Sequence, residues 1–203
     1  RRKREPEKYE ETLKLTISEI DSMNKMISSI LDIGRAEGAQ FEKPLEINII
    51  EFIQKKANDY RMLSAQKNIV ITLTSNVNRH SINLQPTLLT QILQNFVQNA
   101  IKFTPEEKCI NINTKRVDDS IIISVTDEGI GINEDIDLFA PFKRVGGKAG
   151  AGLGLFLAKN ASDTLGGEIL LKNRTDGVQG TVASVTLFGA PNCDLKSKNK
   201  HKK

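Results

Sequence analysis

Hydrophobic residues recur at intervals of three and four between residues 86 and 104, the spacing of one buried face of an α-helix. This face would consist of Leu89, Ile92, Leu93, Phe96, Val97, Ala100 and Ile101. Beside it, three polar side chains share one side of the helix: Asn95, Asn99 and Lys102. Polar groups so close to a core are costly unless they are satisfied. These three side chains therefore form either an ordinary solvated face or a ligand site, since amide oxygens can bind Mg²⁺ and an ammonium group can bind phosphate.

The remaining pattern predicts further helices and strands. Helical spacing is found at residues 7–37, 48–66 and 154–165, and β-rich or alternating segments are found at 69–74, 81–84, 109–114, 120–126, 168–172 and 181–188. Asp118–Asp119 and Asp176–Gly177 would turn two pairs of strands into hairpins. This order predicts an α+β fold, a two-layer α/β sandwich. One mixed, mostly antiparallel sheet would be covered by helices on one face and preceded by a long N-terminal helix.

The N-terminal helix carries a second kind of stripe. Its apolar positions alternate at intervals of four and three, as in a coiled coil, with one polar interruption: Leu13, Ile17, Ile20, Asn24, Ile27 and Leu31. Gly34, Gly38 and Pro44 are expected to close this segment. The pattern favours a dimerisation helix, and a helix packed on its own domain is the alternative.

The composition is that of a soluble globular protein, with 38% hydrophobic and 27% charged residues among 203. Basic residues gather at both ends, which would suit nucleic acid. The chain has no Trp and only two Tyr for base stacking, so we expect solvated termini and no nucleic-acid partner. Residues 191–203 are expected to form a basic, disordered tail. Two isolated cysteines, no apolar run of membrane length and no signal peptide favour a cytoplasmic location.

Two glycine-rich segments carry candidate chemistry. Asp127 ends an apolar strand and is followed by Gly129 and Gly131, so a flat ring could approach the backbone while the carboxylate accepts a hydrogen bond from an amine; a plain turn is the alternative. The glycines at 150, 152 and 154 lead into a helix start, where exposed N–H groups favour phosphate. A dinucleotide-binding fold is disfavoured, because these glycines follow a loop and precede a hairpin instead of belonging to a βαβ unit.

Taken together and in this order, the motifs resemble those of sensor histidine kinases. Leu89–Thr104 resembles the N box of that family, Asp127–Gly131 its G1 box, Phe139–Phe142 its F box and Gly150–Leu155 its G2 box. Ile30–Arg35 also resembles the end of the second helix of the family's dimerisation and phosphotransfer domain. The resemblance implies the α/β sandwich that is shared with gyrase, the heat-shock chaperone ATPases and the mismatch-repair ATPases.

The resemblance also implies an ATP site with bound Mg²⁺. On the helix at 86–104, Asn99 would hold the metal with help from Asn95, Lys102 would reach the phosphates and Phe103 would pack near the nucleoside. The other contacts would come from later segments: Asp127 for the adenine amine, Gly129 and Gly131 for the base pocket, and Gly150, Gly152, Leu153 and Gly154 beside the triphosphate.

By the same resemblance, residues 133–149 would form a mobile lid over the ATP. Lys143, Arg144 and Lys148 are candidates for contact with the γ-phosphate, and ordinary solvation of the lid is the alternative. The implied domains are listed from the N-terminus: the C-terminal helix of the dimerisation domain at 1–43, the ATP-binding catalytic domain at 44–190 and the tail at 191–203.

Asn95 separates two kinds of chemistry within the wider superfamily. In the hydrolysing relatives, the residue four positions before the Mg²⁺-binding Asn is a Glu that activates water, whereas an amide cannot act as a general base. We therefore expect transfer of the γ-phosphoryl group to a histidine, with Asn95, Lys102, Lys143 and Arg144 as candidate catalytic residues. The alternatives are an ATP-gated dimerising ATPase of the gyrase or chaperone type and a degenerate binding module.

The phosphoacceptor histidine is expected upstream of Arg1, because neither His80 nor His201 lies in the family's surrounding motif. In the full-length protein, the resemblance implies a homodimer through the N-terminal helix and a response regulator protein as the partner that receives the phosphoryl group. Any membrane contact is expected only through segments upstream of this chain.

Overall fold

The structure is a computed structural model that describes residues 6–39, 41–143 and 152–188. Its elements in chain order are α1 (Pro6–Ala39), β1 (Leu45–Asn48), α2 (Ile49–Ser64), a 3₁₀ helix η1 (Ala65–Lys67), β2 (Val70–Ser75), β3 (Ser81–Leu84), α3 (Pro86–Phe103), β4 (Cys109–Val117), β5 (Ser120–Asp127), α4 (Gly154–Thr164), β6 (Glu168–Asn173) and β7 (Thr181–Leu187). Every helix and strand expected from the pattern is present, with small shifts at the ends.

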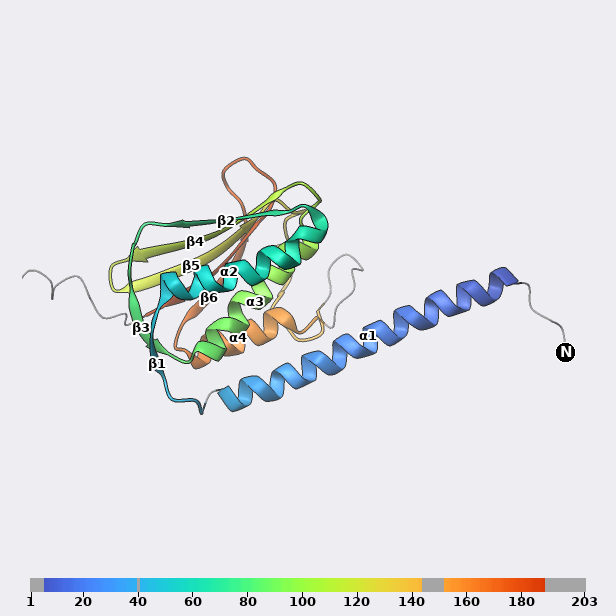
Figure 1. Cartoon of the computed structure of the whole chain (residues 1–203), viewed down its shortest axis with the longest axis horizontal. Coiled ribbons are helices and arrows are strands. Elements are labelled where there is room, and N and C mark those ends of the chain that lie inside the picture. The colour runs from blue at the N-terminus through green and yellow to red at the C-terminus, as the bar shows by residue number, and fades with distance from the viewer. Residues whose placement is uncertain (1–5, 40, 144–151, 189–203) are drawn as a thin grey trace, which may run out of the picture.

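Five strands form the main sheet in the order β2-β4-β5-β7-β6. β2 pairs in parallel with β4, whereas the other neighbours are antiparallel. α2, α3 and α4 lie on one face of this sheet, and most of α1 extends away from it (Figure 1). The predicted α+β sandwich is confirmed. The expectation of a single sheet needs one correction, because β1 and β3 form a separate antiparallel pair.

The strand at Leu45–Asn48 is not apparent in the sequence, because its four residues alternate too briefly to stand out from a loop. Its last residue also begins the next helix. Asn48 Oδ1 accepts the main-chain N–H of Ile50 at 3.2 Å, and Asn48 Nδ2 donates to Glu51 Oε1 at 2.7 Å. This side-chain cap satisfies a free N–H at the helix end and explains why α2 starts directly after the strand.

The helix α3 buries the face that its sequence pattern predicts. Leu89, Ile92, Leu93, Phe96, Val97 and Ala100 are each at most 2% exposed, and Ile101 is half-buried. Along β5, residues alternate strictly between half-buried and buried, and Ile121, Ile123 and Val125 form part of the same core. The alternation continues to the end of the strand, so it turns Asp127 toward the helical layer as well.

The helix α1 runs through Gly34 and Gly38 and ends at Ala39, slightly beyond the expected end. A Cβ atom at either glycine would meet nothing within 4 Å, so each is tolerated in an exposed helix at about 1 kcal/mol relative to alanine. Ala39 belongs to the core of the domain. Thr87 Oγ1 donates to Glu42 Oε1 at 3.0 Å, which ties the end of this segment to the start of α3.

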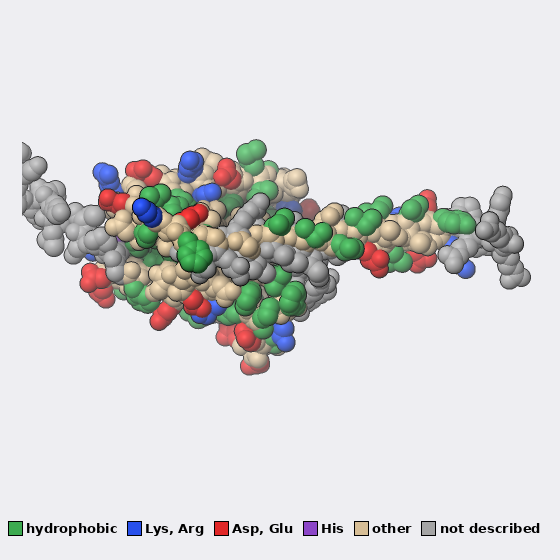
Figure 2. Space-filling model, turned by 90° about the horizontal axis from the view of Figure 1, so that it is seen from below, with side chains coloured by type: hydrophobic (Ala, Val, Ile, Leu, Met, Phe, Trp, Pro, Cys, Tyr) green, Lys and Arg blue, Asp and Glu red, His purple; other side chains and the backbone are tan. Residues whose placement is uncertain are grey.

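The coiled-coil stripe of α1 is not covered by the rest of the described chain. Leu13, Ile17, Ile20, Ile27 and Leu31 are between 50% and 61% exposed. Hydrophobic side chains follow the extended part of this helix in Figure 2. The alternative in which these five residues pack on their own domain is therefore wrong, and dimerisation through them stays a prediction.

Three other expectations concern membranes, histidines and the tail. Across 6–39, 41–143 and 152–188, none of the helices is both long enough and apolar enough to cross a bilayer. His80 is buried directly before β3, and its carbonyl oxygen accepts the N–H of Ile49 at 2.8 Å. His201 and the tail at 191–203 lie outside the described residues.

Candidate functional site

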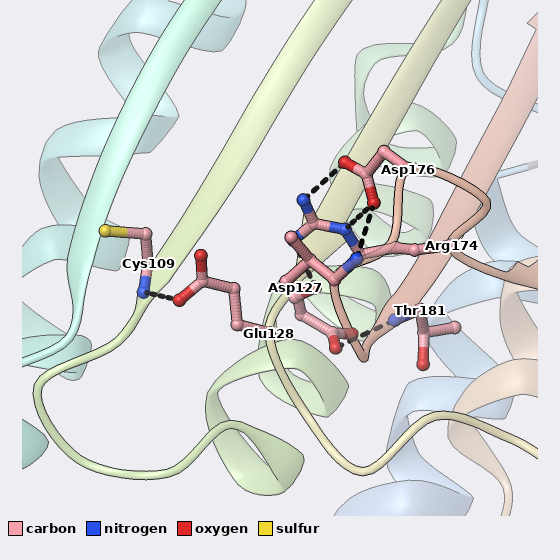
Figure 3. A network of polar contacts seen from close by, with 7 residues as sticks. Cys109, Asp127, Glu128, Arg174, Asp176 and Thr181 are labelled. Atoms are coloured by element: carbon pink, nitrogen blue, oxygen red, sulfur yellow. Dashed lines mark hydrogen bonds and ion pairs between the residues drawn. The ribbon is translucent and has the colours of Figure 1, made fainter.

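Asp127 ends β5 with its side chain almost buried, at 7% exposure. Its Oδ1 accepts two main-chain N–H groups, from Gly129 at 2.8 Å and from Thr181 at 3.0 Å. The second oxygen, Oδ2, has no hydrogen-bond partner within the described part of the chain. Figure 3 shows this carboxylate between the end of β5 and the start of β7. One half of the carboxylate is thus fixed by the backbone, and the other half is left for a donor on a ligand.

The electrostatic surroundings of Asp127 strengthen this reading. Burial raises the pKa of its carboxyl group, while the N–H groups of Gly129 and Thr181 and the charge of Arg174 lower it. The ionised form lacks much of the hydration that it would have at the surface, so it gains from any further hydrogen-bond donor. An exocyclic amine on a flat ring is a donor of the right size and polarity.

The loop after Asp127 lies directly against the end of α3. A Cβ atom at Gly129 would come within 2.9 Å of both Asp127 Oδ1 and the carbonyl oxygen of Phe103, the last residue of that helix. Only glycine allows such a close approach. A Cβ atom at Gly131 would instead lie 2.7 Å from Asn173 Oδ1. The two glycines predicted to shape the base pocket therefore let the loop lie close to α3 at Gly129 and close to β6 at Gly131.

The hairpin formed by β6 and β7 also binds the backbone of this loop, which no sequence motif indicates. Asn173 donates from Nδ2 to the carbonyl of Ile132 at 2.9 Å and accepts the N–H of the same residue at 2.8 Å. Arg174 Nη1 donates to the carbonyl oxygen of Asp127 at 3.1 Å. One sequence signal was available: Gly180 directly precedes β7, and a glycine beside a strand often marks a close approach of another backbone.

The amide row on α3 forms the other end of the site. Asn95 and Asn99 are both half-buried. Asn95 Nδ2 donates to the carbonyl of Gln91 at 2.9 Å, and its Oδ1 lies 2.6 Å from the position that a Cβ atom at Gly154 would take. The amide of Asn99 makes no hydrogen bond to any of the described residues. The amide oxygen of Asn95 therefore lies against the start of α4.

The C-terminal end of α3 is fixed by a lysine from η1. Lys67 Nζ donates to the carbonyl oxygens of Ile101 at 2.7 Å, Lys102 at 3.3 Å and Thr104 at 3.4 Å. These are carbonyls that a helix end leaves without partners, and a lysine there is favourable. Lys102 itself places its Nζ 4.8 Å from the centre of the Phe103 ring. The predicted phosphate and nucleoside contacts thus sit side by side on an anchored helix end.

The start of α4 and part of the predicted lid complete the described site. Leu153 is buried at the N-cap of α4, and Gly152 lies against the lid, since a Cβ atom there would be 2.6 Å from the carbonyl oxygen of Lys143. The side chain of Lys143 is exposed. Three predicted site residues lie outside the described residues: Arg144, Lys148 and Gly150.

These contacts define an elongated site along α3. Asn95 meets Gly154 near one end, and Phe103 meets Gly129 at the other. Asn95 and Phe103 are eight positions apart, about 12 Å along the helix. The chemistry suits a ligand with a flat, amine-bearing ring at the Asp127 end and an anionic group near the N-terminus of α4. Among the described residues no cluster of His, Cys, Asp or Glu could hold a metal ion, so a cation here would depend on the amide oxygens and on the ligand.

Comparison with known proteins identifies the family to which this part of the chain is similar. Residues 84–190 match the model of the histidine kinase-, DNA gyrase B- and HSP90-like ATPases, a segment that contains α3, the Asp127 loop and α4. The virulence sensor protein BvgS of Bordetella bronchiseptica is 34% identical over 179 residues, which cover 82% of this chain and 14% of BvgS. The chain therefore spans a small part of the length of that relative.

Solved structures show the same fold. The catalytic domain of the histidine kinase ThkA is 26% identical, with a TM-score of 0.66 over 73% of this chain and 97% of that domain. ThkA in complex with the response regulator protein TrrA is 23% identical, with a TM-score of 0.70 over 93% of this chain and 54% of that one. The second likeness concerns the fold alone, and it covers a larger share of the present chain than the first.

Proposed function

The chain belongs to the family of histidine kinase-, DNA gyrase B- and HSP90-like ATPases, and from this premise we propose that it is the ATP-binding catalytic part of a sensor histidine kinase. The observation that carries the proposal is the half-satisfied carboxylate of Asp127 beside the C-terminal end of α3, with the amides of Asn95 and Asn99 further back on that helix and Asn95 against the start of α4. Such a site can hold the adenine of ATP at Asp127 and the phosphates near the start of α4.

At the base end, Oδ2 of Asp127 accepts a hydrogen bond from the exocyclic amine of adenine while Oδ1 keeps its two main-chain donors. An inosine nucleotide carries an oxo group in place of the amine, so it would set one acceptor against another. A site built around a specific hydrogen bond rejects the analogue that lacks it. Phe103, whose carbonyl lies against Gly129, would pack near the nucleoside.

At the phosphate end, we assign Mg²⁺ to the amide oxygen of Asn99, with Asn95 assisting. When bound there, the ion would supply positive charge to the phosphates. Lys102, in the last turn of the same helix and beside Phe103, would add a further positive charge for the phosphates. The N-terminus of α4 after Gly152 and Gly154 presents main-chain N–H groups, which favour an anion. Lys143, Arg144 and Lys148 remain the candidates for the γ-phosphate, and Gly150 and Leu153 for the border of the triphosphate.

The amide at position 95 favours phosphoryl transfer over hydrolysis. Asn95 holds its Nδ2 on the carbonyl of Gln91 and has no group that can take a proton from water. In the proposed reaction, a histidine nitrogen forms a bond to the γ-phosphorus, the bond from that phosphorus to the bridging oxygen breaks, and ADP leaves with the electron pair. The chain contributes positioning and charge neutralisation to this step.

The domains, the location and the protein partners are part of the same proposal. Residues 1–43 would be the second helix of a dimerisation and phosphotransfer domain, and residues 44–190 the catalytic domain on the cytoplasmic side. The exposed stripe of α1 supports a homodimer through this helix in the full-length protein. The fold shared with ThkA, whose complex contains a response regulator, supports such a regulator as the next acceptor. No nucleic-acid partner is proposed.

A phosphotransfer assay with a separate acceptor tests the proposal. The full chain is incubated with Mg²⁺, γ-labelled ATP and a separately produced dimerisation domain that carries the acceptor histidine. We expect label on the acceptor in an acid-labile, base-stable form, and no label when the acceptor histidine is replaced by glutamine. Steady release of inorganic phosphate without labelled histidine would instead support an ATPase of the gyrase type. Absence of ATP binding would leave a degenerate binding module.

A further inference from the structure

Arg174, the first residue after β6, is bound to two partners at once. Its Nε and Nη2 donate to the two carboxylate oxygens of Asp176, at 3.0 and 2.6 Å. Its remaining nitrogen, Nη1, donates to the main-chain carbonyl oxygen of Asp127 at 3.1 Å. Figure 3 shows the guanidinium group between Asp176 and Asp127. A planar guanidinium that is held on two nitrogens has the direction of its third nitrogen fixed.

This pair differs from an ordinary surface ion pair. The side chain of Arg174 is only 13% exposed, whereas that of Asp176 is 58% exposed. Asp176 thus lies on the solvent side and orients an arginine that points inward. The hydrogen bond from Arg174 lowers the pKa of Asp176 to about 2, so the pair stays ionised at neutral pH. We call Arg174 and Asp176 the hairpin clamp.

The clamp acts on the residue that carries the base-binding carboxylate. The side chain of Asp127 is already held through Oδ1, and the hairpin clamp holds its main-chain carbonyl. Gly180 lies against the same carbonyl, since a Cβ atom there would come within 2.0 Å of the oxygen. With the main chain and one carboxylate oxygen fixed, the direction of Oδ2 is fixed as well.

We propose that Arg174 is a positioning residue for base recognition: oriented by Asp176, it holds the main chain of Asp127 so that Oδ2 faces the exocyclic amine of the nucleotide. The inference rests on the proposed function, in which Asp127 binds adenine. Arg174 itself need not touch the ligand. The β6–β7 hairpin, which contains none of the family's sequence motifs, thereby takes part in discrimination between bases.

The base preference separates this role from a purely structural one. If Arg174 only held the hairpin together, its loss would weaken the binding of ATP and of inosine triphosphate equally. If Arg174 orients Oδ2, its loss weakens the binding of ATP, which has the amine, more than the binding of inosine triphosphate, which lacks it. The ratio of the two dissociation constants is therefore the quantity to measure.

Calorimetric titration of the full chain with ATP and with inosine triphosphate, both with Mg²⁺, gives this ratio. We expect Arg174→Ala to reduce the preference for ATP by about tenfold, the order of one hydrogen bond to a charged group. Lys172→Ala is the matched control, because Lys172 is exposed near the end of β6, two residues before Arg174, and its removal changes the net charge equally. This control should keep the wild-type ratio.

Asp176→Asn is the second variant, because it leaves Arg174 in place and loosens its orientation. It should reduce the preference for ATP by a smaller factor in the same direction. An unchanged ratio in Arg174→Ala overturns the inference while the proposed function stands. If Arg174→Ala does not fold, an unchanged ratio in Asp176→Asn has the same meaning. A wild-type chain that binds ATP and inosine triphosphate equally would overturn both the proposed base site and this inference.

Discussion

The proposed base end of the site is held by main-chain hydrogen bonds, whereas the proposed phosphate end is made of side chains on one face of a helix. Asp127 takes its geometry from N–H groups of Gly129 and Thr181, which belong to a loop and to a neighbouring strand. Asn99, on α3, has no hydrogen bond to any residue that the structure describes. The first end is formed before any ligand arrives, and the second is completed by what binds there.

This difference predicts separate roles in binding. A preformed carboxylate loses little conformational entropy on binding, so it can contribute to the affinity for any adenine nucleotide. The amides depend on Mg²⁺ and on the phosphates, so their contribution should appear only with a metal-bound triphosphate. Changes at the two ends should therefore have different signatures.

The largest effect is expected from Asp127→Asn, which tests the base end. Asparagine can still accept both main-chain N–H groups through Oδ1, but it places an amide donor where the adenine amine donates. We expect the affinity for ATP and for ADP to fall by about 100-fold, with or without Mg²⁺, because a charge-assisted hydrogen bond is replaced by two opposed donors. Calorimetry measures the loss, and unchanged binding would contradict the assignment of the base to Asp127.

Asn99→Ala should have the next largest effect, confined to the phosphate end. We expect it to remove most of the gain in ATP affinity that Mg²⁺ provides, about tenfold, and to leave metal-free binding unchanged. Gln98→Ala is the matched control, since this amide is exposed on the neighbouring position of α3. Equal losses with and without Mg²⁺ would show that Asn99 does not act through the metal.

A smaller effect is expected from Gly154→Ala, which disturbs the contact between α3 and α4. The new Cβ atom would lie 2.6 Å from Asn95 Oδ1, so the amide must rotate away. We expect ATP affinity to fall by about threefold, since a side-chain amide can move at low cost. Gly38→Ala in α1 is the control, because nothing lies within 4 Å of its added Cβ. Full wild-type affinity in Gly154→Ala would argue against a role for the observed position of Asn95.

The smallest effect concerns stability and pH. The folded-state pKa of Asp127 is raised, mainly by burial, above its value in the unfolded chain. Its contribution to stability is thus fully present below the unfolded pKa and is lost as pH rises through the folded pKa. Asp127→Asn should therefore be at least as stable as the wild type at pH near 7, an advantage that vanishes in acid. Thermal unfolding at several pH values measures it, and a lower Tm at neutral pH would be the contrary result.

The stripes on α3 and α1 show how far periodicity predicts the fold. Both stripes correctly predict helices, and the sandwich follows from the order of the elements. On α3, Phe96 and its neighbours are buried against the sheet, whereas Leu13 and Ile20 on α1 remain exposed. Periodicity identifies a face that will be buried, but the partner of that face need not belong to the same chain. The strand at Leu45–Asn48 is missed because four residues are too few to show an alternating pattern, and only its pairing with β3 makes it a strand.

The site shows the same limit at the level of single residues. Asp127, Asn95 and the glycines can be predicted because each motif is local in sequence. Arg174 and Lys67 cannot, because each acts on the main chain of a segment far away in sequence. Their contacts depend on how the hairpin and the 3₁₀ helix meet the rest of the sandwich. Side-chain to main-chain bonds of this kind leave no pattern of residue types.

The central claim is that the two ends of the site along α3 bind two different parts of one nucleotide. Titration of the wild-type chain with ATP and inosine triphosphate, each with and without Mg²⁺, tests it most directly. We predict that removal of the amine and removal of Mg²⁺ each weaken binding, and that the two losses add in free energy because the ends are separate. Equal affinity for ATP and inosine triphosphate, or the same affinity for ATP with and without Mg²⁺, would contradict the claim.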